Sequence, residues 1–171
     1  MGATMNDPLL AVAAASVDGE RTVLETFLNF HRATIVRKVR GLSEEDARLR
    51  RVPSLTTPAG LVKHLTVMEL RWFQRVLARR TEEELPPEGE EGWILDEHDT
   101  VESLIAEYER VCALSRETAA GFALDHTVPH PRLVRVSLRW IYVHLIEETA
   151  RHAGHADILR ELTDGSTGDV G

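Results

Sequence analysis

Hydrophobic side chains recur every three to four positions over four long stretches of the chain, a spacing typical of helices with one face in a core. The first stretch runs from about Glu20 to Val39, and Gly41 closes it. The second begins near Thr57, with Pro58 in its first turn. The apolar stripe of the second stretch comprises Leu61, Leu65, Met68, Trp72 and Val76.

The third stretch runs from about Val101 to Ala120, with Asp99 or Thr100 as its cap. The fourth is the segment SLRWIYVHLIEETARHAGHADILREL, which ends near residues 163–165. Its apolar stripe comprises Leu138, Ile141, Leu145, Ala156 and Leu159. A short helical turn is predicted after Ser43.

Two segments lack this spacing and are predicted to be loops. Residues 81–93 are acidic and rich in Pro and Gly, and residues 121–137 contain His126 and His130. The pattern therefore predicts an all-α fold, a four-helix bundle with long crossover loops after the second and third helices.

Length and composition indicate one domain. A chain of 171 residues with 43% hydrophobic content can bury a single full-sized core. Residues 1–18 have a short apolar patch without a basic segment before it, so we expect a mobile tail rather than a signal peptide. The predicted domain spans residues 19–168.

Charge and cysteine content narrow the expected partners. A formal net charge of −8 argues against nucleic acid or an anionic membrane as a partner, and no apolar run approaches membrane-spanning length. Cys112 is the only cysteine and lies in a helical pattern, which favours a buried, inert thiol. These features fit a reducing cytoplasm.

The fourth stretch carries the chain's main candidate chemistry. His144, Glu148, His152 and His155 are three or four residues apart, so they lie on one side of the predicted helix. Glu148 and His152 fall inside the apolar stripe, whereas His144 and His155 lie at its edge. A carboxylate directed into a core is costly unless it is compensated, and a bound cation would compensate it.

His64, at the edge of the second stripe, offers a third ligand from another helix. Two imidazoles and one carboxylate leave coordination positions open on zinc or a similar divalent ion, as a catalytic site requires. The alternative is structural: His64 is an ordinary core histidine, and Glu148 pairs with an arginine. The arginines within reach on this interpretation are Arg71, Arg139 and Arg151. Spacing alone leaves both interpretations open.

Three segments resemble a known family: VHLIEETARHAGHADILREL, GLVKHLTVMELRWF and GLSEEDARLRRVPS. They are similar to the DinB-like family of bacterial metal-binding helical bundles over roughly residues 20–168. The closest similarity is to the actinobacterial branch of mycothiol transferases, which is related to mycothiol-dependent maleylpyruvate isomerase. The resemblance implies the DinB-like four-helix bundle.

The resemblance also implies the roles of individual residues. The family's three metal ligands fall on His64, Glu148 and His152. Many members have His where this chain has Glu148, and the mycothiol-dependent isomerase has Glu there. His155 stands at a position that is often Gln, so it is expected beside the ligands or facing the substrate, with Arg151 and His144 as further neighbours.

Three functions remain open on this basis. The first is a thiol transferase or isomerase that uses a divalent metal, zinc or alternatively nickel, and mycothiol as co-substrate for attack on a small electrophile. The second is a metal-binding stress-response module without turnover. The third is a purely structural helical dimer. A second apolar face on the last helix, formed by Val143, Ile146, Ala150 and Ala153, suits such a dimer, and a homodimer is expected and is compatible with all three functions.

Overall fold

Four long helical segments make up most of the structure, a computed structural model that describes residues 8–81, 85 and 90–167. They are α2 (Glu20–Val39), α4 (Pro58–Glu69) with its continuation η2 (Leu70–Leu77), α5 (Val101–Ala120) and α6 (Leu138–Asp164). The prediction of a mainly helical chain is confirmed.

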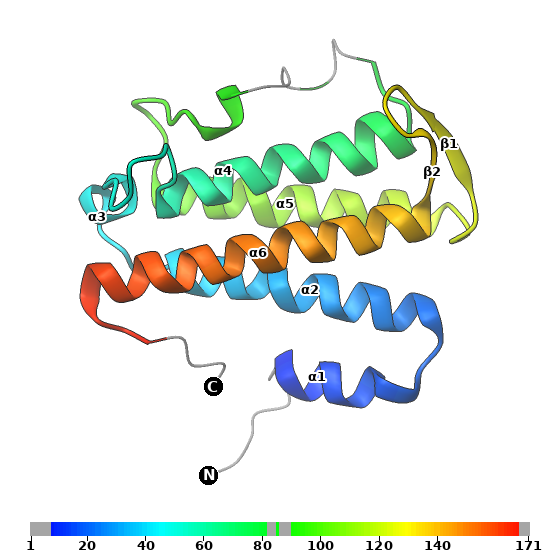
Figure 1. The fold of residues 1–171 in the computed structure, drawn as a ribbon, viewed down its shortest axis with the longest axis horizontal. Helices are drawn as coiled ribbons and strands as arrows, with labels where there is room; N and C mark the ends of the chain where they lie inside the picture. Colours follow the sequence, from blue (N-terminus) through cyan, green and yellow to red (C-terminus); the bar gives the residue numbers. More distant parts are fainter. Residues whose placement is uncertain (1–7, 82–84, 86–89, 168–171) are drawn as a thin grey trace.

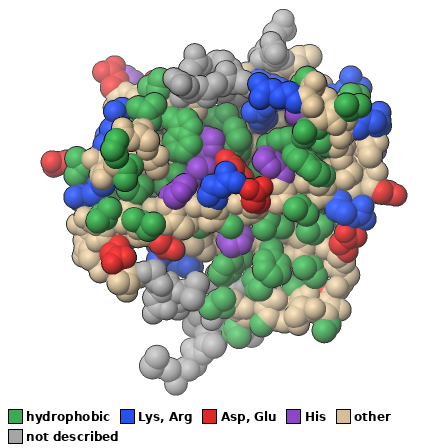
Figure 2. All heavy atoms as spheres, viewed as in Figure 1, with side chains coloured by type: hydrophobic (Ala, Val, Ile, Leu, Met, Phe, Trp, Pro, Cys, Tyr) green, Lys and Arg blue, Asp and Glu red, His purple; other side chains and the backbone are tan. Residues whose placement is uncertain are grey.

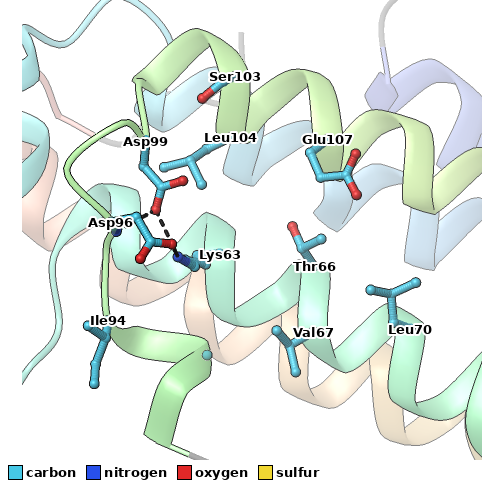
Figure 3. A pocket seen from close by; sticks show the side chains of 11 residues that line it. Lys63, Thr66, Val67, Leu70, Ile94, Asp96, Asp99, Ser103, Leu104 and Glu107 are labelled. Carbon is cyan, nitrogen blue, oxygen red and sulfur yellow. Dashed lines mark hydrogen bonds and ion pairs between the residues drawn. The ribbon is translucent and has the colours of Figure 1, made fainter. Parts of the chain in front are cut away.

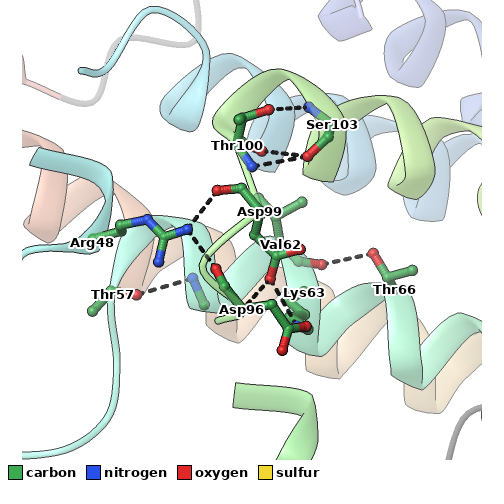
Figure 4. Close-up of polar contacts among 10 residues, drawn as sticks. Arg48, Thr57, Val62, Lys63, Thr66, Asp96, Asp99, Thr100 and Ser103 are labelled. Atoms are coloured by element: carbon green, nitrogen blue, oxygen red, sulfur yellow. Dashed lines mark hydrogen bonds and ion pairs between the residues drawn. The ribbon is translucent and has the colours of Figure 1, made fainter. Parts of the chain in front are cut away.

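The helices begin at residues whose side chains accept hydrogen bonds from free backbone N–H groups. Thr57 Oγ1 accepts from Gly60 at the start of α4, and Ser137 Oγ accepts from Trp140 at the start of α6. At α5, Thr100 and Ser103 satisfy each other's backbone N–H groups in a capping box (Figure 4). These local signals explain why the predicted bounds of the long helices agree with the structure.

The long helices lie side by side, with α6 between α4 and α2, and with α5 against α4 (Figure 1). One end of the core is filled by the buried side chains of Ile35, Leu61, Leu65, Tyr108 and Leu159. The other end is filled by Leu28, Phe73, Leu77, Leu138 and Leu145. Within the described residues, no helix combines the length and apolar character needed to span a bilayer.

The predicted second helix changes its winding part-way. From Leu70 to Leu77 the chain is π-helical, and the N–H of Ala78 donates to the carbonyl of Phe73, five residues back. Three consecutive side chains, Trp72, Phe73 and Gln74, are buried there. Apolar spacing cannot distinguish this wider helix from an α-helix over two turns.

The predicted loop at residues 121–137 is wrong in part, because it contains a hairpin of β1 (Thr127–His130) and β2 (Val134–Ser137). The strands are antiparallel, and Val128 pairs with Val136. Both valines are buried against the core end formed by Leu138 and its neighbours. Each strand has only four residues, too few for an alternation of apolar and polar positions to be recognised in the sequence.

The N-terminal region is also more regular than expected. Within the predicted tail, α1 (Pro8–Ala14) and η1 (Ala15–Val17) precede α2, and Ala15 is buried. Residues 1–7 of that tail and residue 168 of the predicted domain lie outside the described residues. The short turn after Ser43 is α3 (Glu44–Arg48), as predicted.

The acidic loop and the second apolar face of α6 also differ from expectation. The last part of the loop forms a 3-10 helix, η4 (Glu90–Trp93), while residues 82–84 and 86–89 lie outside the described part of the chain. On α6, Ala153 belongs to the core, and only Val143 of the proposed dimer face is strongly exposed. The chain itself therefore uses part of the face on which a homodimer was expected.

A buried ion pair joins α2 to α4 inside the bundle. Arg32 donates to both carboxylate oxygens of Glu69, at 2.8 and 2.6 Å, and a third guanidinium nitrogen donates to Asn29 Oδ1 at 3.0 Å. The side chains are only 7% and 2% exposed. Because two charges have been removed from water, each depends on the other.

Glu69→Gln should lower the free energy of unfolding by about 3 kcal/mol, since it leaves the Arg32 guanidinium buried without a carboxylate. Urea denaturation of the variant measures this. Glu107→Gln breaks the exposed pair with Arg110 and should cost less than about 1 kcal/mol. An Arg32→Met/Glu69→Met double variant should recover most of the loss. An equal loss in the double variant would show that packing, not charge, dominates.

Candidate metal centre

Three residues predicted as metal ligands meet between α4 and α6. Glu148 Oε1 lies 3.2 Å from His64 Nε2 and 3.1 Å from His152 Nε2. The donor atoms of the three side chains are all within 4.8 Å of one another. His152 is buried, and His64 and Glu148 are 12% and 15% exposed. Side chains 84 residues apart in sequence thus form one cluster.

His155 and Arg151 flank this cluster on α6. His155 Nδ1 lies 3.3 Å from Nδ1 of His152, the ring nitrogen that does not face Glu148. Arg151 lies 3.3 Å from the other oxygen of Glu148 and also pairs with Glu147. The predicted arginine partner of Glu148 therefore exists, but it occupies only the oxygen that faces away from the two histidines.

Trp93, which the sequence analysis left in a loop, closes one side of the cluster. Its indole stacks on the His64 ring, with centroids 4.0 Å apart and planes 16° apart. It also meets the His152 ring edge-on at 5.5 Å. One tryptophan at the end of an acidic, Gly-rich segment was the only sequence signal for this contact. A large flat ring there limits the freedom of His64 and excludes water.

The segment after Trp93 is fastened to α4. Lys63, the residue before His64, donates to carboxylates of Asp96 and Asp99, each at 2.8 Å (Figure 3). Arg48 binds the backbone carbonyls of the same two aspartates (Figure 4). A cavity of about 630 Å³ lies between this segment, α4 and α5. These contacts hold the chain in place directly after the indole.

Aromatic rings continue from the cluster along the first half of α6. His144, one turn before Glu148, stacks on Trp140 with centroids 5.0 Å apart and contacts Trp72 at 4.6 Å. Trp72 also stacks on His130 at 5.3 Å. His130 is buried and lies on β1, not in a loop as predicted for residues 121–137. Its Nδ1 accepts from the backbone N–H groups of residues 132 and 133.

The hydrogen bonds around Glu148 keep it charged. Those with His152 and His64 hold the pKa of Glu148 well below its usual range and outweigh the effect of burial. Burial instead lowers the pKa of His144, although Glu148 and Glu147 oppose this. A carboxylate that stays ionised between two imidazoles is a suitable ligand for a cation.

Cys112 is chemically remote from this centre. It is buried on α5, and burial raises the pKa of its thiol to about 12. The thiolate is the reactive form of cysteine, so this side chain is inert near neutral pH. The expectation of a buried, unreactive thiol is confirmed.

Histidine and charged side chains also gather at the surface of the bundle. Figure 2 shows histidine side chains gathered near the middle of this face, with charged groups between them and hydrophobic side chains around them. The view is that of Figure 1, in which α4 and α6 face the reader. His64 and Glu148 retain 12% and 15% exposure, so the cluster is not fully sealed from solvent.

Comparison with known proteins identifies the family. A family model described as mycothiol-S-transferase matches residues 23–165. The chain belongs to this family. The searches of curated proteins and of solved structures found no match to this chain. The resemblance to the mycothiol transferase branch is therefore confirmed, and membership implies mycothiol S-transferase activity.

The matched region of the mycothiol-S-transferase family contains every residue of the cluster and its neighbours. The donor set also fits a divalent ion. Two imidazole nitrogens and one carboxylate oxygen, already within 4.8 Å of one another, need only small shifts to reach a common ion. Such a set leaves positions open for a further ligand.

Proposed function

We propose that the protein is a metal-dependent mycothiol S-transferase that acts on small electrophiles. The observation that supports this is the convergence of His64, Glu148 and His152 from two helices onto one point, in a chain that belongs to the mycothiol-S-transferase family. We further propose zinc as the ion and the DinB-like four-helix bundle as the arrangement of α2, α4, α5 and α6.

A divalent cation at these three donor atoms would lower the pKa of a coordinated thiol, so that the thiolate predominates at neutral pH. Glu148 brings the negative charge that favours the cation. His152 would hold the ion through Nε2, and its Nδ1–H would then donate to Nδ1 of His155, 3.3 Å away. Trp93 holds the His64 ring in place.

The remaining residues serve the substrates. The sulfur of the co-substrate forms a bond to an electrophilic carbon, and the leaving group departs with the electron pair of the bond that breaks. His144 has a lowered pKa, so near neutral pH it is uncharged and can accept the proton that the thiol releases. Arg151, already beside Glu148, can bind a negatively charged group of either substrate.

The metal assignment is tested by removing one ligand at a time. After loading with zinc and desalting, the wild-type protein should retain about one ion per chain, while His64→Ala and His152→Ala should retain almost none. His98→Ala is the matched control, because that side chain is 90% exposed. Elemental analysis gives the ratio. Full occupancy in both ligand variants would refute the site.

His155 should act on the metal through His152. His155→Leu removes the hydrogen-bond partner of His152 Nδ1, and metal affinity should fall roughly 10- to 100-fold. His155→Gln retains an acceptor and should bind nearly as tightly as the wild type. Competition with a chromophoric chelator measures both. Wild-type affinity in the leucine variant would show that His155 does not orient the ligand.

Transferase activity is tested by thiol consumption. Zinc-loaded protein should accelerate the loss of mycothiol in the presence of one or more small electrophiles, such as a haloarene, an alkyl halide or an activated alkene. His64→Ala should reduce the rate to background, and glutathione should be a poorer thiol. Zinc binding without thiol loss for any electrophile would instead support a metal-binding module without turnover.

A further inference from the structure

A second potential ligand site lies between α2 and α5, away from the two helices that carry the metal cluster. The two helices border a groove of about 830 Å³, a size typical of small-molecule sites. Its walls include Ala33, Val36 and Cys112, and four arginines line it as well. Neither the metal cluster nor its neighbouring rings contribute to it.

The charges of this groove do not cancel. Arg32 is neutralised by Glu69, and Arg40 pairs with Glu109 at 3.0 Å. Arg37 and Arg116 have no carboxylate partner among the described residues, although the chain as a whole carries a formal net charge of −8. Two unpaired guanidinium groups in one groove of an acidic protein favour an anion there.

Unsatisfied polar atoms on the same lining point to a ligand. Tyr108 is 1% exposed, yet among the described residues no nitrogen or oxygen atom pairs with its hydroxyl, and the polar group that acts on it at close range is the thiol of Cys112, a weak hydrogen-bonding partner. The Nε of Arg37 is likewise buried without a partner. Leaving buried donors unpaired costs free energy, and a bound acceptor would recover it.

We propose that the α2–α5 groove binds a small organic anion. The carboxylate or phosphate group of the anion pairs with Arg37 and Arg116 and accepts a hydrogen bond from the Tyr108 hydroxyl. The apolar body of the anion lies on Ala33 and Val36. Guanidinium groups suit either head group, because both offer two oxygens to a planar donor. The anion is a ligand additional to the thiol and electrophile, and its binding does not depend on a metal.

Calorimetric titration of the purified full-length chain, at constant ionic strength, tests this. The probes are benzoate, phenyl phosphate and inorganic phosphate, with benzyl alcohol as an uncharged comparison. At least one organic anion should bind saturably with a dissociation constant on the order of 1 mM or lower, and benzyl alcohol should not. Comparison of benzoate with phenyl phosphate distinguishes a carboxylate site from a phosphate site.

Variants locate the site. Arg37→Gln/Arg116→Gln should weaken binding by about tenfold or more, while Arg50→Gln, an exposed arginine outside the groove, should not. His64→Ala should bind as the wild type does. Tyr108→Phe should weaken anion binding. It should also raise the melting temperature without ligand, because it removes a buried hydroxyl whose partner is at best a weakly hydrogen-bonding thiol.

Three results would overturn the proposal. One is the absence of saturable binding for every anion. Another is unchanged affinity in the double arginine variant. The third is loss of binding in His64→Ala, which would place the anion at the metal cluster instead.

Discussion

The buried pair of Arg32 and Glu69 constrains how the helices can pack. It joins α2 to α4, and its charges act on Tyr108 and Cys112 of α5 and on Tyr142 of α6. A rotation of α4 would separate the Glu69 carboxylate from the buried guanidinium of Arg32, at a cost of several kcal/mol. Five residues earlier on α4, His64 lies about 140° around the helix, so the pair also directs His64 toward α6.

The metal cluster depends on this orientation of α4 about its axis and on the packing of α4 against α6. Glu148 and His152 come from one helix and are set by local geometry, whereas His64 reaches them only if two helices pack in the correct register. In the structure, Glu148 Oε1 contacts both histidines, which keeps the carboxylate ionised and the three donors close. The protein thus holds its candidate ligands near one another before any ion arrives, so binding requires little rearrangement.

The long helices and two members of the cluster could be predicted because their signals are local. Apolar spacing indicates each long helix. The starts of α4, α5 and α6 coincide with Thr57, Thr100 and Ser137, whose side chains cap them. The contact of Trp93 with His64 depends on how a loop folds back, which no spacing records. The hairpin and the burial of His130 likewise depend on Trp72, more than fifty residues away in sequence. The π-helical winding depends on the packing of the core.

The burial of Cys112 has a consequence for a protein of this family. A protein that handles a low-molecular-weight thiol also meets the disulfides of that thiol, and exposed cysteines are trapped by them as mixed disulfides. That exchange requires an accessible thiolate. The single sulfhydryl of this chain is only 4% exposed on α5, and its pKa is raised to about 12. Burial and the raised pKa therefore both disfavour trapping of this chain by the disulfides of an oxidised thiol pool.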